Sequence, residues 1–484
     1  MSIYKIVCFS VILFISINLY NFNINALAQV ETTNNAPSSE AVTSINDAII
    51  KSILIISQVA VLGIIFNHFF FNRFINKKRS DIRSEQKETV SYFNYQFLKR
   101  LTFIIILCCI SIVIFSSSSI LLQSYQLAQN LNLGIFSAFD ILYTTSVGQV
   151  WLLRIITSLA ILGIIISYTS YRRRKKTNEK INESPDKYTL DNKYRSSNNI
   201  SDQIFLLIIM VLSSINLFSN SMVSHSNSLS SFSSFAVSMD WVHFMAVSIW
   251  IGGLFYLSSI VLRILKPVKY SEKTIRTNNG SDISRNMVSI HNVSIALMNF
   301  SFIVIITLCI IGISGLYLGY IHLQNIDSVF NTLYGQILVL KLALAFPLIF
   351  IGRYNQLKIY KYTSLTSNIV KNMKSVDDIF VQQHEEKRTI LYNTLNKSIK
   401  IESILGVSVL VVASFLSITS PPSLEAIDQG SNLIQNSDNT NAGNSNDSFF
   451  SYLVITLAII ITIIGIMNFK KNQKQIKNIS ALTR

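Results

Sequence analysis

Charged residues are scarce in this sequence, and their scarcity excludes an ordinary water-soluble protein. Only 14% of the 484 residues are Asp, Glu, Lys or Arg, whereas soluble proteins carry about 25%. Glycine and proline are also few, with 16 and 6 residues, which excludes a collagen-like or linker-dominated chain. Half of the residues are hydrophobic, so the composition predicts a protein that crosses a membrane several times.

Cysteine and nucleotide-binding motifs are missing where a disulfide-rich or ATP-driven protein would have them. Cys8 lies in the N-terminal leader, and Cys108, Cys109 and Cys309 lie in apolar segments, which excludes a disulfide framework. The sequence has neither a G-x-x-x-x-G-K-[ST] phosphate loop nor a D-K-T-G phosphorylation site. We therefore expect no nucleotide cofactor, no enzymatic activity and no catalytic residue.

The first 28 residues have the pattern of a secretory signal peptide. Lys5 precedes an apolar core from Ile6 to Leu19, and residues 26–28 have the small-x-small form of a cleavage site. An uncleaved first membrane helix is the alternative. In either case residues 29–47 form a short segment outside the membrane.

Nine later segments are apolar over about 20 residues, the length that crosses a hydrocarbon core of ~30 Å as a helix. Backbone groups in lipid must bond within their own segment, so we expect helices, and the alternating pattern of a β-barrel is absent. The predicted fold is all-α and polytopic. The nine segments are 48–71, 101–122, 150–170, 203–220, 238–262, 295–321, 335–353, 401–420 and 449–468.

Lysine and arginine alternate between loops in a way that predicts the orientation. The loops at 123–149, 221–237, 322–334 and 421–448 contain no Lys or Arg, whereas the loops between them and the tail at 469–484 hold nearly all of these residues. Under the positive-inside rule the basic loops are cytoplasmic. We therefore expect a protein of the cytoplasmic membrane with its mature N-terminus outside and its C-terminus inside. The net charge of +16 then reflects topology, and no nucleic-acid partner is expected.

A short motif occurs twice, 187 residues apart, where an outer loop enters a helix that runs inward. Thr145, Gly148 and Arg154 of the first copy match Thr332, Gly335 and Lys341 of the second. Copies with the same direction predict a parallel duplication, and each glycine is expected to permit a close backbone approach. We expect Arg154 and Lys341 to reach the outer interface or pair with an outer Asp, and not to bind metal.

The duplication suggests a division of the chain. It comprises an N-terminal half at 48–200 with about three helices and a cytoplasmic loop, a second half at 201–422, a disordered outer linker at 423–448, and a last helix with a basic tail at 449–484.

Candidate metal ligands gather around the fourth and fifth segments. Met239 and His243 are four residues apart, and Asp240 and His243 three apart, so each pair shares a helix face. Thioether sulfur and imidazole nitrogen together suit copper, and Asp240 is a candidate to orient the His243 ring. Interfacial polar residues without a metal are the alternative. The candidate ligands are His243, Met239, His225, Met222 and Met245, with Trp250, Gly252 and Gly253 as supporting residues.

These residues carry a resemblance to a known family. Asp240, His243, Trp250, Gly252 and Gly253 fit the D-x-x-H-x6-W-x-G-G-L pattern of the copper resistance protein D (CopD) family. Further similar stretches at 300–317, 332–344, 352–355 and 395–402 follow in the same order, and the similarity is good over 200–422 and weaker over 45–200. The resemblance implies a membrane protein that moves copper ions.

The resemblance also leaves open how copper reaches the membrane. Many relatives carry or accompany a soluble copper-binding β domain, and residues 29–47 are too short to be one. A separate outer-face copper-binding protein or direct capture of the ion is therefore expected. Within the membrane, Met298 and Cys309 form a candidate relay on nearly one helix face.

Two other functions remain open from the sequence. A haem b electron carrier needs axial His pairs. A membrane sensor or scaffold that does not transport would use the basic cytoplasmic loops as its output surface. The imidazoles available for a haem are His68, His225, His243, His291 and His322.

Overall fold

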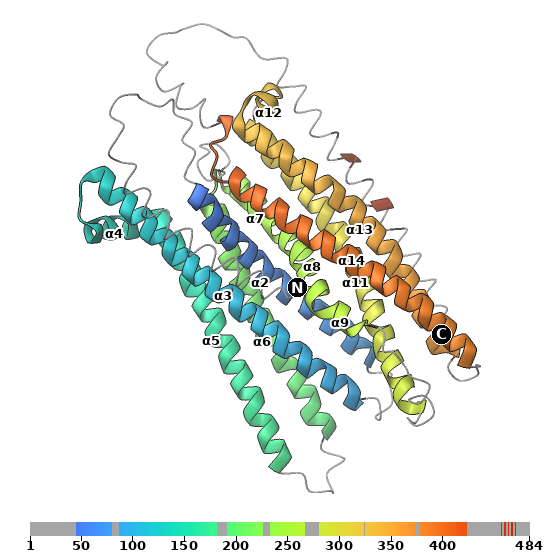
Figure 1. The fold of residues 1–484 in the computed structure, drawn as a ribbon. Helices are drawn as coiled ribbons and strands as arrows, with labels where there is room; N and C mark the ends of the chain where they lie inside the picture. The colour runs from blue at the N-terminus through green and yellow to red at the C-terminus, as the bar shows by residue number, and fades with distance from the viewer. Residues whose placement is uncertain are drawn as a thin grey trace.

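The protein is a bundle of long helices that lie side by side (Figure 1). The structure, a computed structural model, describes residues 45–79, 87–181, 191–225, 233–266, 280–323, 325–372 and 378–423, with isolated positions between 456 and 470. Every regular element in these ranges is a helix. The long ones are α2 (Ile45–Arg79), α3 (Lys87–Leu131), α5 (Ser146–Ile181), α6 (Asp191–Met222), α11 (Gly280–Leu323), α13 (Leu333–Asn372) and α14 (Asp378–Leu416).

Eight helices of the described residues are long and apolar enough to cross a membrane, which confirms the prediction of a polytopic helical membrane protein. Their spans begin and end close to the first eight apolar segments of the sequence. The signal peptide, the linker after Ser423 and most of the ninth segment lie outside the described residues. The spans are Asn46–Phe71, Lys99–Leu131, Ser146–Tyr171, Gln203–Met222, Ser234–Ile264, Val293–Leu323, Leu333–Ile369 and Glu386–Leu416.

Several helices continue far beyond their apolar stretch. The expectation of a cytoplasmic loop over 354–400 was wrong, because α13 extends to Asn372 and α14 already begins at Asp378. Hydropathy marks only the part of a helix that lies in hydrocarbon. Lys, Gln, Glu and Leu, which are frequent beyond that boundary, are good helix formers, so the backbone bonding pattern continues.

The duplicated motif adopts the same local structure in both places. Short helices α4 (Ile135–Thr144) and α12 (Asp327–Asn331) lie at one end of the bundle (Figure 1) and end at an extended Thr145 or Thr332. Each Thr hydroxyl accepts a bond from the backbone N–H of the glycine three residues later, at 3.1 Å, which caps the next helix. A Cβ at Gly148 or Gly335 would lie within 2.4 Å of a carbonyl oxygen of the preceding short helix. The glycines are therefore required by this turn, and the duplication itself remains a prediction.

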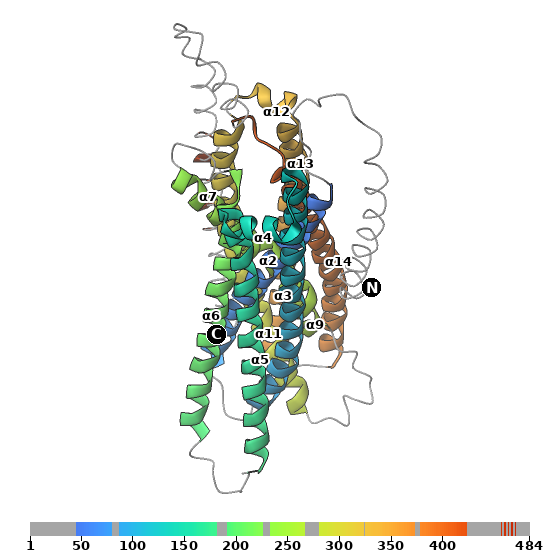
Figure 2. The same ribbon diagram turned by 90° about the vertical axis from the view of Figure 1, so that its left-hand side faces the viewer.

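The fifth span and α2 form the centre of the bundle. The fifth span consists of α7 (Ser233–Val247), the π-helical turn η3 (Ser248–Gly252), α8 (Gly253–Tyr256), a second π-helical turn η4 (Leu257–Val261) and α9 (Leu262–Ile264). In the most apolar windows of α2 and of this span 72% of the residues are buried, against 11% in α13. Figure 2 shows α2 enclosed by other helices, and it packs against α3, α6, α11, α14, η3 and α8.

Two glycines bring these central helices into backbone contact. A Cβ at Gly252 would lie 2.6 Å from the Cα of Gly63, so neither position has room for a side chain. The π-helical turn leaves carbonyl groups without their usual partner in the helix. Asn67 of α2 supplies one, because its Nδ2 donates to the carbonyl oxygen of Ile249 at 3.0 Å. The α2–η3 contact therefore combines close packing with a hydrogen bond.

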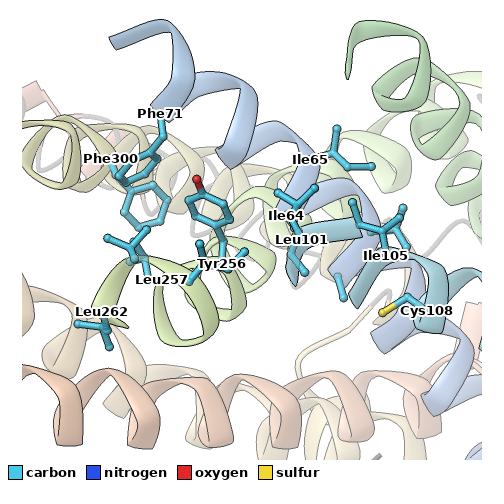
Figure 3. Packing of buried hydrophobic residues seen from close by; sticks show 14 of the residues in the cluster. Ile64, Ile65, Phe71, Leu101, Ile105, Cys108, Tyr256, Leu257, Leu262 and Phe300 are labelled. Atoms are coloured by element: carbon cyan, nitrogen blue, oxygen red, sulfur yellow. The ribbon is translucent and has the colours of Figure 1, made fainter. Parts of the chain in front are cut away.

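Aromatic side chains fill the core beyond this contact. Figure 3 shows Phe71 of α2, Tyr256 of α8 and Phe300 of α11 turned toward one another. The ring centroid of Phe71 lies 5.3 Å from that of Tyr256 and 6.2 Å from that of Phe300. These rings join three helices and hold the fifth span in place.

Candidate metal site

Two histidines from different helices meet at the end of the bundle where α12 lies. His225 follows the end of α6, and His322 is close to the end of α11. Their ring centroids are 6.4 Å apart and their planes nearly perpendicular, and Tyr334 of α13 packs against His322 at 6.1 Å. Nε2 of His225 is buried and has no hydrogen-bond partner among the described residues. A buried nitrogen of this kind is an available metal ligand.

The environment keeps the His225 ring neutral. Burial lowers the pKa of His225 to about 4, and the charge of Lys51 acts in the same direction, whereas the backbone of Thr419 opposes it. The imidazole therefore carries no proton charge at physiological pH. Neutral imidazole is the form that binds metal.

A buried acid offsets the cations around this histidine pair. Asp240 of α7 lies beside the Ser221 and Ser224 side chains and within electrostatic range of Lys51 and Lys341. Its Oδ2 is buried and has no hydrogen-bond partner among the described residues. Lys51 in turn donates to the carbonyl oxygen of Ser417 at 2.9 Å. The two lysines that the sequence left unexplained therefore surround the carboxylate of Asp240.

His243 stands apart from the histidine pair. Its Nδ1 lies 2.9 Å from the hydroxyl of Ser314 on α11, and its ring also faces Gly315. Ser314 precedes His322 by eight residues, which places His243 roughly 12 Å deeper along α11. The structure does not bring Asp240 and His243 together, because their side chains turn toward different helices.

The methionines are distributed rather than gathered around His243. The Met245 sulfur accepts a hydrogen bond from Ser214 of α6 at 3.4 Å, and the side chain packs with apolar residues around Trp250. Met222 is 39% exposed at the end of α6. Met239 is half-buried on α7, one turn from His243 toward the outer end.

Arg154 corrects an expectation from the sequence. It is only 2% exposed, so it does not reach the interface. Its Nε donates to the Ser219 hydroxyl at 2.7 Å and its Nη2 to Asn220 Oδ1 at 3.1 Å. Asn216 donates back to the Arg154 carbonyl oxygen, and Trp151 packs on the guanidinium. Local hydrogen bonds, which hydropathy cannot reveal, make deep burial tolerable.

The remaining candidates lie in the packed interior. Trp250 is buried in η3, Gly252 faces Gly63, and a Cβ at Gly253 would meet the ring of Phe300 at 2.7 Å. Met298 is buried in the apolar core, and Cys309 is half-buried. The two sulfurs belong to residues roughly 16 Å apart along α11, too far to share one ion.

The described residues contain no group of three or more His, Cys, Asp or Glu side chains that could hold a metal ion. The site therefore resembles neither a structural zinc site nor a multi-carboxylate calcium site. What it offers is a pair of imidazoles, a composition that suits copper among other transition metals. Low coordination with ready release is the property that a transported ion requires.

Sequence reasoning missed His322 as a metal ligand. It was counted only among imidazoles for a haem, because nothing in the sequence pairs it with His225 almost a hundred residues earlier. Its position gave a usable signal, since it closes a membrane helix on the same side as His225 and Tyr334.

Comparisons with known proteins bear on the second half of the chain. Residues 294–416 match the family model described as Copper resistance protein D. Copper transport protein CutJ of Bacillus subtilis (strain 168) is 25% identical over 185 residues, which cover 38% of this chain and 25% of that relative. No solved structure matches.

The matched segment coincides with the helices on one side of the bundle. It runs from within α11 to the last residue of α14, so it contains Ser314, His322 and Lys341. His225, Asp240, His243 and Trp250 precede it. The resemblance stated from the sequence is thereby confirmed: residues 294–416 of this membrane protein are a copper resistance protein D domain.

Proposed function

We propose that this protein captures copper ions at the outer end of the bundle and moves them across the cytoplasmic membrane. The copper resistance protein D domain and the similarity to a protein named for copper transport support a copper-related role. The direction is inward, toward the cytoplasm, because the imidazole pair lies on the side that the charge pattern assigns to the exterior. The mature N-terminus is outside and the C-terminus inside.

The spacing of His225 and His322 carries the proposal. Bonds from imidazole nitrogen to a metal such as zinc are about 2.0–2.1 Å long, so two rings that share one ion in a line have centroids roughly 6 Å apart. The observed separation is 6.4 Å. Perpendicular ring planes are compatible with such an arrangement, since each ring contributes a nitrogen lone pair in its own plane.

His243 is the second station of the proposed route. It lies deeper than the histidine pair and, like His322, contacts α11. Met239 lies one helical turn from it toward the exterior and supplies a thioether that favours Cu(I). Asp240 offsets the positive charge of Lys51 and Lys341, which would otherwise repel a cation. A separate copper-binding protein outside the membrane delivers the ion to this end.

The test measures copper accumulation in vesicles that contain the purified protein. We expect His322→Ala and His225→Ala each to lower the initial rate more than ~10-fold, the least that loss of even a supporting group at a metal site costs. His384→Ala, in the region of α14 expected to be cytoplasmic, is the control and should be silent. Equal rates in all four proteins would refute capture by the histidine pair. A Soret band in the purified protein would instead support a haem b carrier.

A further inference from the structure

A carboxylate is buried inside the membrane below the candidate metal site. Glu402 of α14 is only 3% exposed and lies within the span Glu386–Leu416. Its Oε2 accepts a hydrogen bond from Nδ2 of Asn355 on α13 at 2.6 Å. Trp250 of η3 lies on its other side. Trp250 follows His243 by seven residues, so this site is roughly 10 Å deeper along the fifth span.

The surroundings of Glu402 are shaped for an uncharged or exchanging group. A Cβ at Gly352 would lie 3.2 Å from Oε1 of Glu402, so the absence of a side chain there leaves room for the carboxyl group. Asn355 is itself 3% exposed, and its Oδ1 has no hydrogen-bond partner among the described residues. A buried acceptor beside a carboxyl group indicates that a donor or a small cation belongs between them.

No cation compensates Glu402 among the described residues. Its interaction partners there are Asn355 and Trp250, both uncharged. The titratable groups on the packed elements are engaged elsewhere. On α13, Arg353 donates to Gln356; His68 of α2 pairs with Tyr256 of α8; and Lys51 of α2 bonds to Ser417 near the outer end.

An ionised carboxylate without a partner is expensive in this environment. Its hard oxygen atoms are poor ligands for Cu(I), which prefers sulfur and nitrogen. We infer that Glu402 is a proton-carrying group, which holds a proton while the site is at rest and releases it when a copper ion passes. A nearby cation favours the ionised form of a carboxyl group, so arrival of the ion drives the proton out and departure restores it. Copper entry is thereby coupled to proton movement in the opposite direction.

The protonated state can be tested on the full-length protein without any variant. A lipid-soluble carbodiimide reacts with protonated carboxyl groups in apolar surroundings, and mass spectrometry of peptides locates the adduct. We expect labelling of Glu402 at neutral pH that declines as the pH is raised. Glu386, which is exposed on the same helix, is the internal control and should stay unlabelled. An unmodified Glu402, or equal labelling of both residues, would overturn the inference.

The coupling rests on the proposed function and is tested in vesicles that contain a pH-sensitive dye. We expect copper uptake by the wild type to drive protons outward. Glu402→Gln, which fills the same volume, should abolish the proton signal, Glu402→Asp should retain it with a shifted pH profile, and Glu386→Gln should match the wild type. No copper uptake by the wild type would refute the proposed function while leaving the carbodiimide result intact. Copper uptake with unchanged proton movement in Glu402→Gln would refute the inference alone.

Discussion

Replacing Gly63 by alanine tests the contact at the centre of the bundle. The new Cβ would lie 2.0 Å from the carbonyl oxygen of Ser248 and 2.5 Å from the Cα of Gly252. Both atoms belong to backbone, so no change of rotamer relieves the clash. Separation to 3.0 Å requires a movement of about 1 Å between α2 and η3. The same movement lengthens the hydrogen bond from Asn67 to Ile249, which is 3.0 Å in the wild type.

The magnitude follows from these two effects. Overpacking of a tight contact costs about 1–3 kcal/mol, and loss of a buried hydrogen bond adds about 1 kcal/mol. A total of about 2–4 kcal/mol changes the unfolding equilibrium roughly 30- to 700-fold, at about 1.4 kcal/mol for each factor of ten. The thermal midpoint of the purified protein, followed by size-exclusion chromatography after heating, should fall clearly below that of the wild type.

Gly163→Ala on α5 is the matched control for this experiment. No atom lies within 4 Å of a Cβ built there, and alanine is favoured over glycine in a helix interior by about 1 kcal/mol. Its thermal midpoint should therefore equal or exceed that of the wild type. Identical midpoints for Gly63→Ala and Gly163→Ala would show that the helices do not meet at these glycines.

Two further predictions concern the turn motif and the orientation. Gly335→Ala should reduce the folded yield, because its Cβ would lie 2.4 Å from two carbonyl oxygens, whereas Gly319→Ala meets nothing within 4 Å; equal yields would contradict a packing role for the repeat. In sealed cells, Asn331→Cys on α12 should react with an impermeant thiol reagent and Lys180→Cys should not, because Lys and Arg placement orients the loops. Labelling of position 180 from outside would reverse the proposed topology.

Hydropathy alone was sufficient for the membrane spans. An apolar run of about 20 residues is a local property, and lipid leaves the backbone little choice except a helix. The duplicated Thr-x-x-Gly motif was also readable, because an N-cap and the glycine it bonds lie three residues apart. The pattern did not reveal the π-helical turns around Trp250, since their extra residue per turn depends on packing against Gly63 and Asn67 of α2.

The site shows the other side of this division. The types of its residues and their side of the membrane were predictable, because spacing and charge are written along the chain. Their partners were not. His225 meets His322 rather than His243, Arg154 bonds to Ser219 rather than reaching the interface, and Glu402 meets Asn355 and Trp250. Each of these contacts depends on which helices are neighbours and how each is rotated about its axis, and only the packing of the whole bundle decides both.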